Sequence, residues 1–481
     1  MLGVGLVGCT LGPDFQSPEP ADTPRRWVSD GESVPSRTVE GSVDITWWKT
    51  FRDSKLSSLV ERLTAQNLDL QTAAERVVQS VAQRQVAVSQ GLPHIQAESL
   101  ITYNRASPNG PISLFVPAPG APLDYGLFRD GLTSSWQLDL FGRVRRAVEA
   151  ADANALAAVE NRHGVALAAV AELAQSYMLL RGTQSRLEIA KHNLALVEEN
   201  VELVNQRFAN GTATTLEVAQ ARALRATIAA TLPPLRSQEV ELINAIGLLL
   251  GNPPRALEAE LQRVRMIPRV PRKVPVGLPG ILVRRRPDVR EAEARLHEAT
   301  AQTGVAIANF YPDVTLNGSV NLESLHVSNL FNLSSTAFAV GPSISIPIFE
   351  GGQLRGTLAL RESQQREAAI FFQKTVLRAW KEVDDALTAY REVQRRRVDV
   401  AQSVTENRAA LQSAKQRYTE GAIDFLNVIA AQTQLLQSEN DLADSDTRIA
   451  TDLVNLYRAL GGGWEVADIA YRTDSAGSIR E

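Results

Sequence analysis

One segment of the chain occurs twice, and this duplication constrains the fold more than any other feature. Residues 206–222 read QRFANGTATTLEVAQAR, and residues 416–432 read QRYTEGAIDFLNVIAAQ. Each copy has the pattern of a helix end, a turn and a new helix start, with Gly211 or Gly421 placed to supply the positive φ of a helix C-cap. Because a repeated unit builds the same piece of one architecture, the function is to be sought in a duplicated scaffold.

The duplication extends well beyond this turn. Pro93 and Pro312 hold matching places, and the helical pattern before each proline is also repeated. In each half we expect a helix, two strands and a long helical hairpin, in that order. We therefore divide the chain into a remnant signal peptide (1–8), an extended N-terminal segment (9–60), a first repeat (61–255), a linker (256–284), a second repeat (285–462) and a C-terminal tail (463–481).

Four short segments alternate apolar and polar residues, which is the signature of a β-strand with two different faces. Each is about nine to eleven residues long, the length of a tilted strand that crosses a bilayer. Gln137 and Asp139 are expected on the polar face. A soluble sheet packed on one face remains the alternative, because a single alternating strand is a weak signal. The residues expected to face lipid are Ile95, Trp136, Leu138, Leu316, Val320, Phe338 and Ile344.

The stretches between these segments predict long helices. Residues 143–208 contain no proline, and residues 353–418 are their counterpart in the second half. At about 1.5 Å per residue, such a helix is roughly 100 Å long. The returning stretches are 213–250, interrupted by two prolines, and 423–460. Taken alone, these helices also fit a soluble coiled-coil scaffold, which is a different class of protein.

The number of strands limits how they could span a membrane. Four strands cannot close a barrel, since small closed barrels need about eight. An open sheet edge in lipid leaves backbone groups unpaired, which is very costly. If the strands span a membrane, several chains must therefore pool them. A conduit favours three chains or more, because the interior of an eight-stranded barrel is filled by side chains.

Composition argues against several other classes of protein. The 50 Lys and Arg residues and 54 Asp and Glu residues give a formal charge of −4, without the broad basic character of nucleic-acid binding. No apolar run of about 20 residues stands out, so no transmembrane helix is expected. The five histidines lack metal-ligand spacing, and no phosphate loop or nucleophile elbow occurs in its proper context. The sequence predicts neither an enzyme nor a cofactor.

The single cysteine, Cys9, follows the small residues Val7 and Gly8. Leu6-Val7-Gly8-Cys9 looks like a lipobox, the motif at which the signal peptide of a lipoprotein is cleaved. The residues before Cys9 include no Lys or Arg, unlike the basic start of a complete signal peptide. We expect Cys9 to be the lipidated first residue of the mature chain.

The whole pattern resembles the TolC-type outer-membrane efflux factors, in the NodT-like lipoprotein branch. The resemblance runs from Cys9 to about Gly461, and its motifs occur in a specific order. They are Cys9 with GPDF, WWKTFRDSKL at 47–56, NLDLQTAAERV at 67–77, SWQLDLFGRVRR at 135–146, LPPLRSQEVELINAIGLLLGNPP at 232–254, RRPDVREAEARL at 285–296, FYPDVTL at 310–316, SIPIFEGGQLR at 345–355 and RYTEGAIDFLNV at 417–428.

This resemblance implies an α+β membrane protein that forms a homotrimer. Four strands per chain would build a twelve-stranded β-barrel in outer-membrane lipid, and the long helices would continue it as a periplasmic α-helical barrel. The implied function is the exit duct of a tripartite pump, which passively conducts small molecules from the periplasm to the exterior. Its partners would be a periplasmic adaptor protein and an inner-membrane transporter of the RND type. A channel for type I protein secretion is the alternative within the same class.

The resemblance also implies that the hairpin tips dock the adaptor and close the channel. Relatives often carry carboxylates at the positions of Asn427 and Ala430, which this chain lacks. Asp424 remains as a ring carboxylate or as the N-cap of the last helix. Leu426 is expected to form an apolar constriction, and Arg417 with Tyr418 to latch neighbouring helices. The candidate residues are Arg417, Tyr418, Glu420, Gly421, Asp424, Leu426 and Asn427 in the second hairpin, and Arg207, Phe208 and Gly211 in the first.

Overall fold

A computed structural model of the chain describes residues 10–19, 23–24, 27, 34–107, 109 and 123–468. The chain divides into two units. The first comprises residues 77–157 and 292–372 together with the N-terminal stretch up to Pro18, and the second comprises the remainder. Each unit therefore takes residues from both halves of the duplicated sequence.

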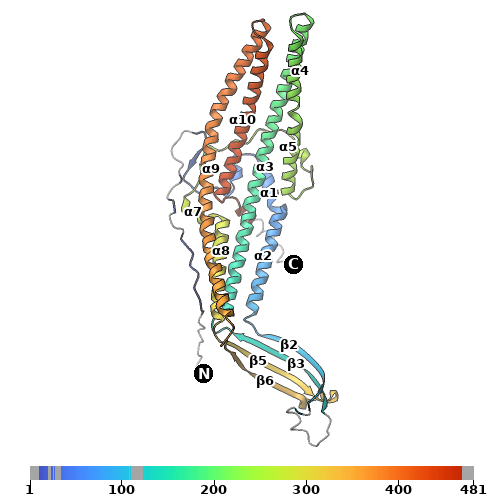
Figure 1. Cartoon of the computed structure of the whole chain (residues 1–481), viewed down its shortest axis with the longest axis vertical. Helices are drawn as coiled ribbons and strands as arrows, with labels where there is room; N and C mark the ends of the chain where they lie inside the picture. Colours follow the sequence, from blue (N-terminus) through green and yellow to red (C-terminus); the bar gives the residue numbers. More distant parts are fainter. Residues whose placement is uncertain are drawn as a thin grey trace. The chain divides into compact units, whose positions relative to one another are not determined.

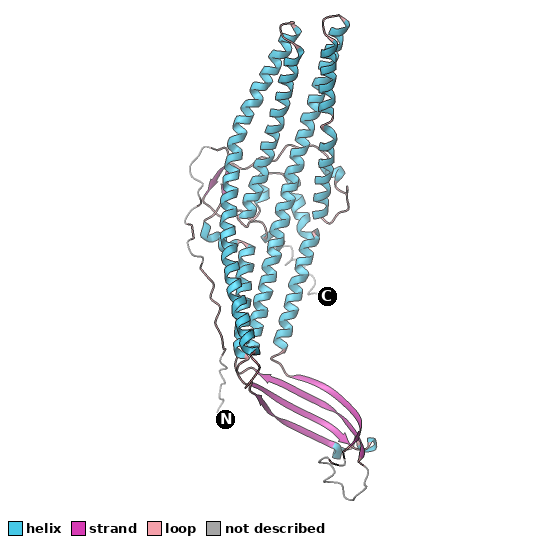
Figure 2. Ribbon diagram, viewed as in Figure 1, coloured by secondary structure: helices cyan, strands magenta, loops and turns pink. Residues whose placement is uncertain are grey.

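The first unit contains a four-stranded antiparallel sheet (Figures 1 and 2). Its strands lie in the order β2 (His94–Arg105), β3 (Asp124–Leu138), β5 (Asp313–Ser324) and β6 (Thr336–Ser345). The short 3-10 helices η3 (Val327–Asn329) and η4 (Leu333–Ser335) connect β5 to β6. Within the described residues β2 and β6 each have one neighbour only, so both outer edges of the sheet are open.

The register of the strands gives the sheet one apolar and one polar face. Directly paired residues point to the same face, and successive residues alternate between faces. The seven residues expected on the apolar face all lie on one side by this register, and Ile95, Phe338 and Ile344 are well exposed in the single chain. Apolar rows are Leu132–Val320–Phe338, Trp136–Leu316–Pro342 and Leu138–Val314–Ile344; polar rows are Thr133–Ser319, Ser135–Asn317 and Gln137–Thr315–Ser343.

Asp139 does not lie on the polar face of the sheet, and this part of the sequence prediction is wrong. β3 ends at Leu138, and the carboxylate of Asp139 accepts hydrogen bonds from the backbone N–H groups of Val144 (3.0 Å) and Arg145 (2.9 Å). The first N–H groups of a helix have no partner within the helix, so a carboxylate placed there satisfies them. Asp139 therefore ends the strand and caps the helix that follows.

Two long helices have equal lengths, as the duplication predicts. α3 (Arg143–Ala209) and α9 (Gln353–Thr419) are each 67 residues long, and both are preceded in their repeats by 22-residue helices, α2 (Leu68–Ser89) and α8 (Pro287–Ala308). The chain returns through α4 (Thr215–Ala229) and α5 (Leu232–Leu249) in the first half, and through the unbroken α10 (Phe425–Ala459) in the second. The break between α4 and α5 precedes the two prolines, which cannot sit in a helix interior.

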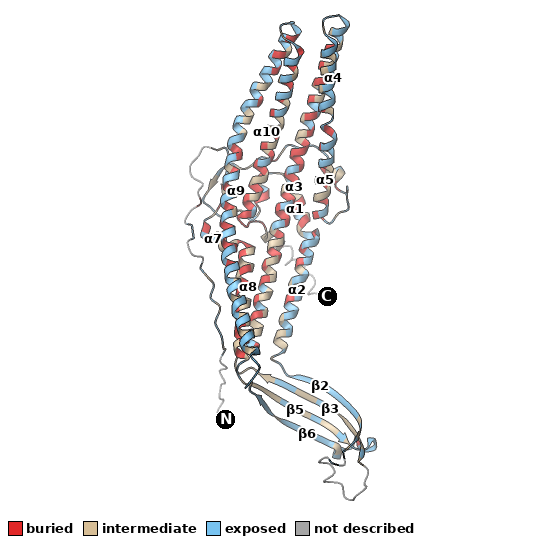
Figure 3. Cartoon of the chain, in the orientation of Figure 1, coloured by how far each residue is buried: buried red, intermediate tan, exposed pale blue. Residues whose placement is uncertain are grey.

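The expectation that no apolar run is long enough to span a membrane is too strict. α3 contains an 18-residue window with a mean hydropathy of 1.2, which passes a test of length and composition. Of that window, 56% is buried inside the chain, as in the core helix of a soluble protein. Figure 3 shows buried and exposed positions alternating along α3, α9 and α10.

The second unit has an aromatic core near the base of its hairpins. The 3-10 helix η1 (Trp47–Phe51) and α1 (Ser54–Gln66) bury their apolar side chains, and Trp47 stacks on Tyr457 of α10 at a centroid distance of 5.1 Å. Nearby, β1 (Arg37–Val39) pairs in parallel with β4 (Lys273–Pro275). Two short helices flank β4 in sequence, α6 (Glu258–Leu261) and α7 (Pro279–Arg285).

Candidate functional site

The two hairpin tips of the second unit end in the same type of turn. Gly211 has a φ of 72° and Gly421 a φ of 76°, in the left-handed region that glycine favours. The N–H of Thr212 donates to the carbonyl of Arg207 at 2.8 Å, and the N–H of Ala422 donates to that of Arg417 at 2.8 Å. Each of these hydrogen bonds joins the first and the last of six residues, which is the pattern of a Schellman C-cap. The repeated turn predicted from the sequence is confirmed.

The helices that leave the tips begin differently. Thr214 and Glu217 form a capping box: the Thr214 hydroxyl accepts from the Glu217 N–H at 3.2 Å, and the Glu217 carboxylate accepts from the Thr214 N–H at 2.7 Å. Asp424 occupies the equivalent N-cap position of α10, but its side chain accepts no capping hydrogen bond. The exposed Asp424 carboxylate is therefore not hydrogen-bonded to a main-chain N–H group of α10.

Tyr418 joins the two tips within one chain. Its ring is only 3% exposed, packs against Phe425 at 5.2 Å and carries the Arg207 guanidinium at 4.5 Å from the ring centroid. Arg207 Nη1 also donates to the main-chain oxygen of Tyr418 at 2.6 Å, while the Tyr418 hydroxyl donates to Glu217 Oε1 at 3.4 Å. We call Arg207, Glu217 and Tyr418 the tip latch.

The Tyr418 hydroxyl of the tip latch has a raised pKa. Burial raises the pKa of the Tyr418 hydroxyl above its usual value, and the neighbouring Glu217 carboxylate raises it further. The phenol is therefore protonated at neutral pH and remains a donor toward the carboxylate.

The sequence predicted Arg417 and Tyr418 as one latch between neighbouring helices, whereas the structure separates their roles. Tyr418 is buried between the hairpins of its own chain. Arg417 is exposed and forms no ion pair with any residue that the structure describes. Glu217 was not among the predicted residues, although the capping-box pattern and its alignment with Asn427 in the repeat could have indicated it.

In each tip, the start of the second helix exposes a large apolar side chain. Leu216 at the start of α4 is 64% exposed, and Leu426 at the equivalent place in α10 is 60% exposed. Phe208 is partly exposed beside the first turn. The other predicted tip residues that lie at the surface are Arg417, Glu420, Asp424 and Asn427.

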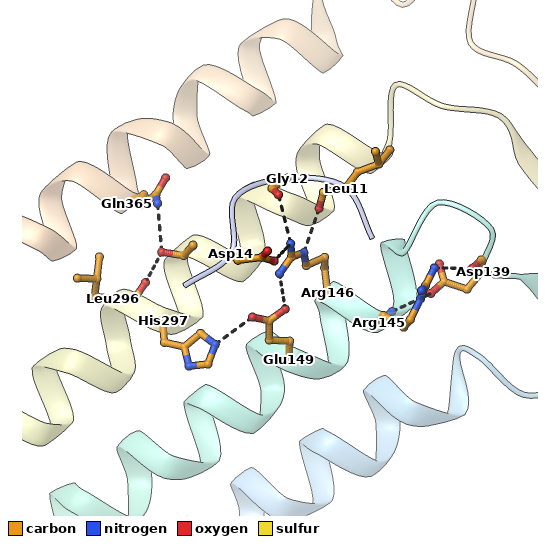
Figure 4. A network of polar contacts seen from close by, with 11 residues as sticks. Leu11, Gly12, Asp14, Asp139, Arg145, Arg146, Glu149, Leu296, His297 and Gln365 are labelled. Carbon is orange, nitrogen blue, oxygen red and sulfur yellow. Dashed lines mark hydrogen bonds and ion pairs between the residues drawn. The ribbon is translucent and has the colours of Figure 1, made fainter. Parts of the chain in front are cut away.

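The first unit fixes the N-terminal segment against the start of α3 (Figure 4). The buried Arg146 donates to the carbonyls of Leu11 (3.0 Å) and Gly12 (3.2 Å) and pairs with Asp14 (2.7 Å) and Glu149 (2.7 Å). Gly12 has a φ of 91°, and a Cβ on it would lie 2.6 Å from the Cα of Gly304, so the segment passes very close to α8. Cys9 itself lies outside the described residues.

Within the described residues, no group of three or more His, Cys, Asp or Glu side chains is placed to hold a metal ion. The first unit offers a two-faced sheet with open edges and a docked N-terminal segment, and the second unit offers a pair of capped hairpin tips. A two-faced sheet with open edges is typical of a subunit that pools its strands with other chains.

The chain belongs to the outer membrane efflux protein family, whose profile matches residues 59–252 and 278–462. It is 31% identical to the probable efflux pump outer membrane protein SepC of Pseudomonas putida, covering 96% of both chains. It is 32% identical to nodulation protein T of Rhizobium leguminosarum bv. viciae, covering 98% of this chain and 94% of the relative. The solved structure of the outer-membrane channel OprN superposes with a TM-score of 0.87 at 33% identity, covering 95% of this chain and all of that one.

The protein is therefore an outer-membrane efflux protein, and the class and location predicted from the sequence are confirmed.

Proposed function

We propose that three copies of the chain form the outer-membrane exit duct of a tripartite efflux pump. The observation that carries this proposal is the register of the sheet, which gathers apolar side chains on one face and polar side chains on the other. β6 of one copy would pair with β2 of the next, closing a twelve-stranded barrel that leaves no edge in lipid. The apolar face would meet lipid, and the polar face would line a water-filled lumen.

Exposed apolar side chains on the helices support the association of several copies. On α2, Val78, Val81 and Val86 are more than half exposed, and on α9 Leu360 and Ile370 are as well. Large exposed apolar surfaces are typical of interaction sites. Contact between such faces of adjacent copies would continue the duct as a helical barrel through the periplasm.

The hairpin tips would close the duct and receive the adaptor. In this proposal the tip latch holds the two hairpins of one copy together, while the exposed Arg417 and Asp424 are free to contact the next copy. Leu426 would narrow the opening. Leu216 on the first tip would offer an apolar contact to a periplasmic adaptor, which in turn would connect the duct to an inner-membrane transporter of the RND type.

A lipid on Cys9 would add a second attachment to the membrane. The bonds from Arg146 to Leu11 and Gly12 support this, because they hold the segment just after Cys9 next to the helix that follows β3. Two or three acyl chains bind a bilayer far more firmly than one.

The cargo in this proposal is a small molecule rather than a secreted protein. Relatives of this chain carry names such as "Toluene efflux pump outer membrane protein TtgF" and "Cation efflux system protein CusC". Because these names give different cargoes, the relatives support the function of an efflux duct but do not indicate one particular substrate.

Reconstitution and complementation test the proposal together. The purified protein should cross-link as a trimer and give discrete conductance steps in a planar bilayer. Expression with a cognate adaptor and transporter in a strain without its own efflux ducts should restore resistance to small toxic compounds. A monomer that gives no conductance and no resistance would contradict the trimeric duct.

A further inference from the structure

The linker between α6 and β4 carries a dense run of positive charge. Residues 263–273 read RVRMIPRVPRK, with five cationic side chains and no carboxylate, in a chain whose formal charge is −4. β1 adds a sixth cation, because Arg37 pairs in register with Lys273. We call the six residues the basic strip: Arg37, Arg263, Arg265, Arg269, Arg272 and Lys273.

The cations of the basic strip form no ion pairs within the described residues, although Glu188, Glu439 and Asp446 line the groove that Arg265 borders. All six residues are exposed, and none of them forms an ion pair with any part of the chain that the structure describes. Other exposed arginines of the same unit do have partners: Arg225 pairs with Glu198 at 2.8 Å, and Arg408 pairs with Glu439 at 2.8 Å. Adjacent like charges repel, so this arrangement is stabilised when an external anion covers it.

Buried contacts hold the strip in an extended form. Arg181 is fully buried, and its Nη1 donates to the carbonyls of Leu261 (3.3 Å) and Arg263 (3.0 Å). At the other end, the N–H of Arg37 donates to the carbonyl of Arg272 at 3.0 Å. Two prolines between these points restrict the backbone further. Both ends of the strip are therefore held by the folded chain.

The strip is remote from the hairpin tips. Its anchor, Arg181, is about 40 Å along α3 from the helix end at Ala209, at about 1.5 Å per residue. Val264, Arg265 and Met266 form one wall of an open groove of 640 Å³, whose other walls are α3, α9 and α10. A molecule that binds the strip would therefore be distinct from an adaptor that docks at the tips.

We propose that the basic strip binds the carboxylate-bearing peptides of peptidoglycan, the cell-wall polymer of the periplasm. An extended strip of eleven residues is about 30 Å long, enough to meet several carboxylates of a repeating polymer at once. Five of the six cations are arginines, whose planar guanidinium groups match carboxylates with two parallel hydrogen bonds. This inference rests on the periplasmic placement of the helices given above, and it goes beyond conduction.

Co-sedimentation of the full-length, detergent-solubilised protein with purified peptidoglycan sacculi tests the inference. The native protein should sediment with sacculi at low salt and be released as salt screens the charges. The triple variant R265Q/R269Q/R272Q should bind about tenfold more weakly, since each exposed ion pair contributes a factor of up to about five. The control R222Q/R225Q/R236Q removes the same charge from α4 and α5 and should bind like the native protein.

Two further probes identify the chemistry. Sacculi whose carboxylates are converted to amides should no longer retain the protein, and chitin, a glycan without peptides, should not retain it. Equal retention of the triple variant, or retention by amidated sacculi, would overturn the proposal. Equal binding to vesicles with one-quarter phosphatidylglycerol would also overturn it in favour of a lipid surface. Bilayer conductance of the triple variant should equal that of the native protein, so failure of the strip is distinguishable from failure of the duct.

Discussion

The guanidinium carbon of Arg207 lies 4.5 Å from the centroid of the Tyr418 ring, and Arg207 Nη1 donates to the Tyr418 carbonyl at 2.6 Å. The two residues come from the two hairpins of the duplicated scaffold. Arg417, the repeat equivalent of Arg207, is exposed instead. The two copies have therefore diverged at this position, where one arginine joins the hairpins and the other faces outward.

Arg207→Ala should loosen the two hairpin tips. The change removes a cation–π contact of about 0.5–2 kcal/mol and a charge-assisted bond to the main chain. If the tip latch favours the closed duct, a loss of one or two kcal/mol should raise resting conductance about 5- to 30-fold. Single-channel recording in a planar bilayer measures this directly.

The matched control for Arg207 is Arg222→Ala on α4. Among the residues that the structure describes, this exposed arginine is bonded only to Asn205, at 3.4 Å. Its removal should leave resting conductance unchanged. Glu217→Gln should have a smaller effect than Arg207→Ala, because the Tyr418–Glu217 bond is long at 3.4 Å. Native conductance in the Arg207 variant, with trimers intact, would remove the tip latch from the gate.

Asp424→Asn should weaken cation selectivity without destabilising α10. The exposed Asp424 carboxylate makes no capping bond, so its removal does not cost the ~1 kcal/mol of a lost N-cap. Three such carboxylates near a threefold axis would attract cations, and neutralising them should shift the reversal potential in a salt gradient toward zero. Asp385→Asn, which neutralises an exposed carboxylate of α9 away from the tip, is the control. An unchanged reversal potential in Asp424→Asn would contradict a carboxylate ring.

The elements of this fold that could be predicted are those that depend on local chemistry. Strand alternation, proline-free stretches and the glycines of the tips identified β2, β5, β6, α3 and α9 within a few residues. β3 has 15 residues, so it is longer than the nine to eleven residues expected, and its first part was missed. The end of β3 was placed too late, because Leu138 and Leu140 continue the apolar alternation past the strand. The alternation of apolar and polar residues does not show that the carboxylate of Asp139 binds the first N–H groups of α3.

The partner of Tyr418 could not be predicted from local patterns. Arg207 and Tyr418 are 211 residues apart in the sequence, and their contact depends on how two hairpins pack. The sequence indicated which positions belong to the tips, but not which side chains turn inward. The sequence pattern likewise does not identify the basic strip, because the fold decides whether a cationic side chain is exposed and whether it has an ion-pair partner.

Cysteine scanning should reveal the two faces of β3. In a Cys9→Ser background, cysteines at positions 133 and 137 should react with a membrane-impermeant thiol reagent that enters the lumen, while those at 132 and 136 should be protected by lipid. Leu132→Arg should cost about 2–4 kcal/mol near the bilayer midplane, and Thr133→Arg much less. Equal labelling of odd and even positions would contradict the proposed barrel.

Cys9 should carry lipid in the mature protein. Mass spectrometry of the N-terminal peptide from native membranes should find diacylglycerol and N-acyl groups on Cys9, and Cys9→Ala should abolish labelling with a fatty-acid analogue. The variant barrel should still insert, since its apolar face is unchanged. An unmodified Cys9 in the native protein would refute the anchor.

Gly182→Ala should separate α3 from α10. A Cβ on Gly182 would lie 2.3 Å from Thr447 Oγ1 and 2.7 Å from its Cγ2, and Thr447 is held by a 2.7 Å bond from its hydroxyl to the Ala443 carbonyl. Such overpacking costs about 1–3 kcal/mol, more than the gain of up to ~1 kcal/mol in helix propensity. Thermal unfolding followed by circular dichroism should show a lower midpoint.

Two further variants isolate the cause of that destabilisation. The double variant G182A/T447A should recover most of the lost stability, because the second change removes the atoms that clash. Gly164→Ala lies in the same helix, but its Cβ would meet Pro287 at 4.0 Å, an ordinary contact. It should therefore be neutral or slightly stabilising through helix propensity alone. If Gly182→Ala unfolds at the same temperature as Gly164→Ala, close packing at Gly182 does not determine the stability of the hairpin base.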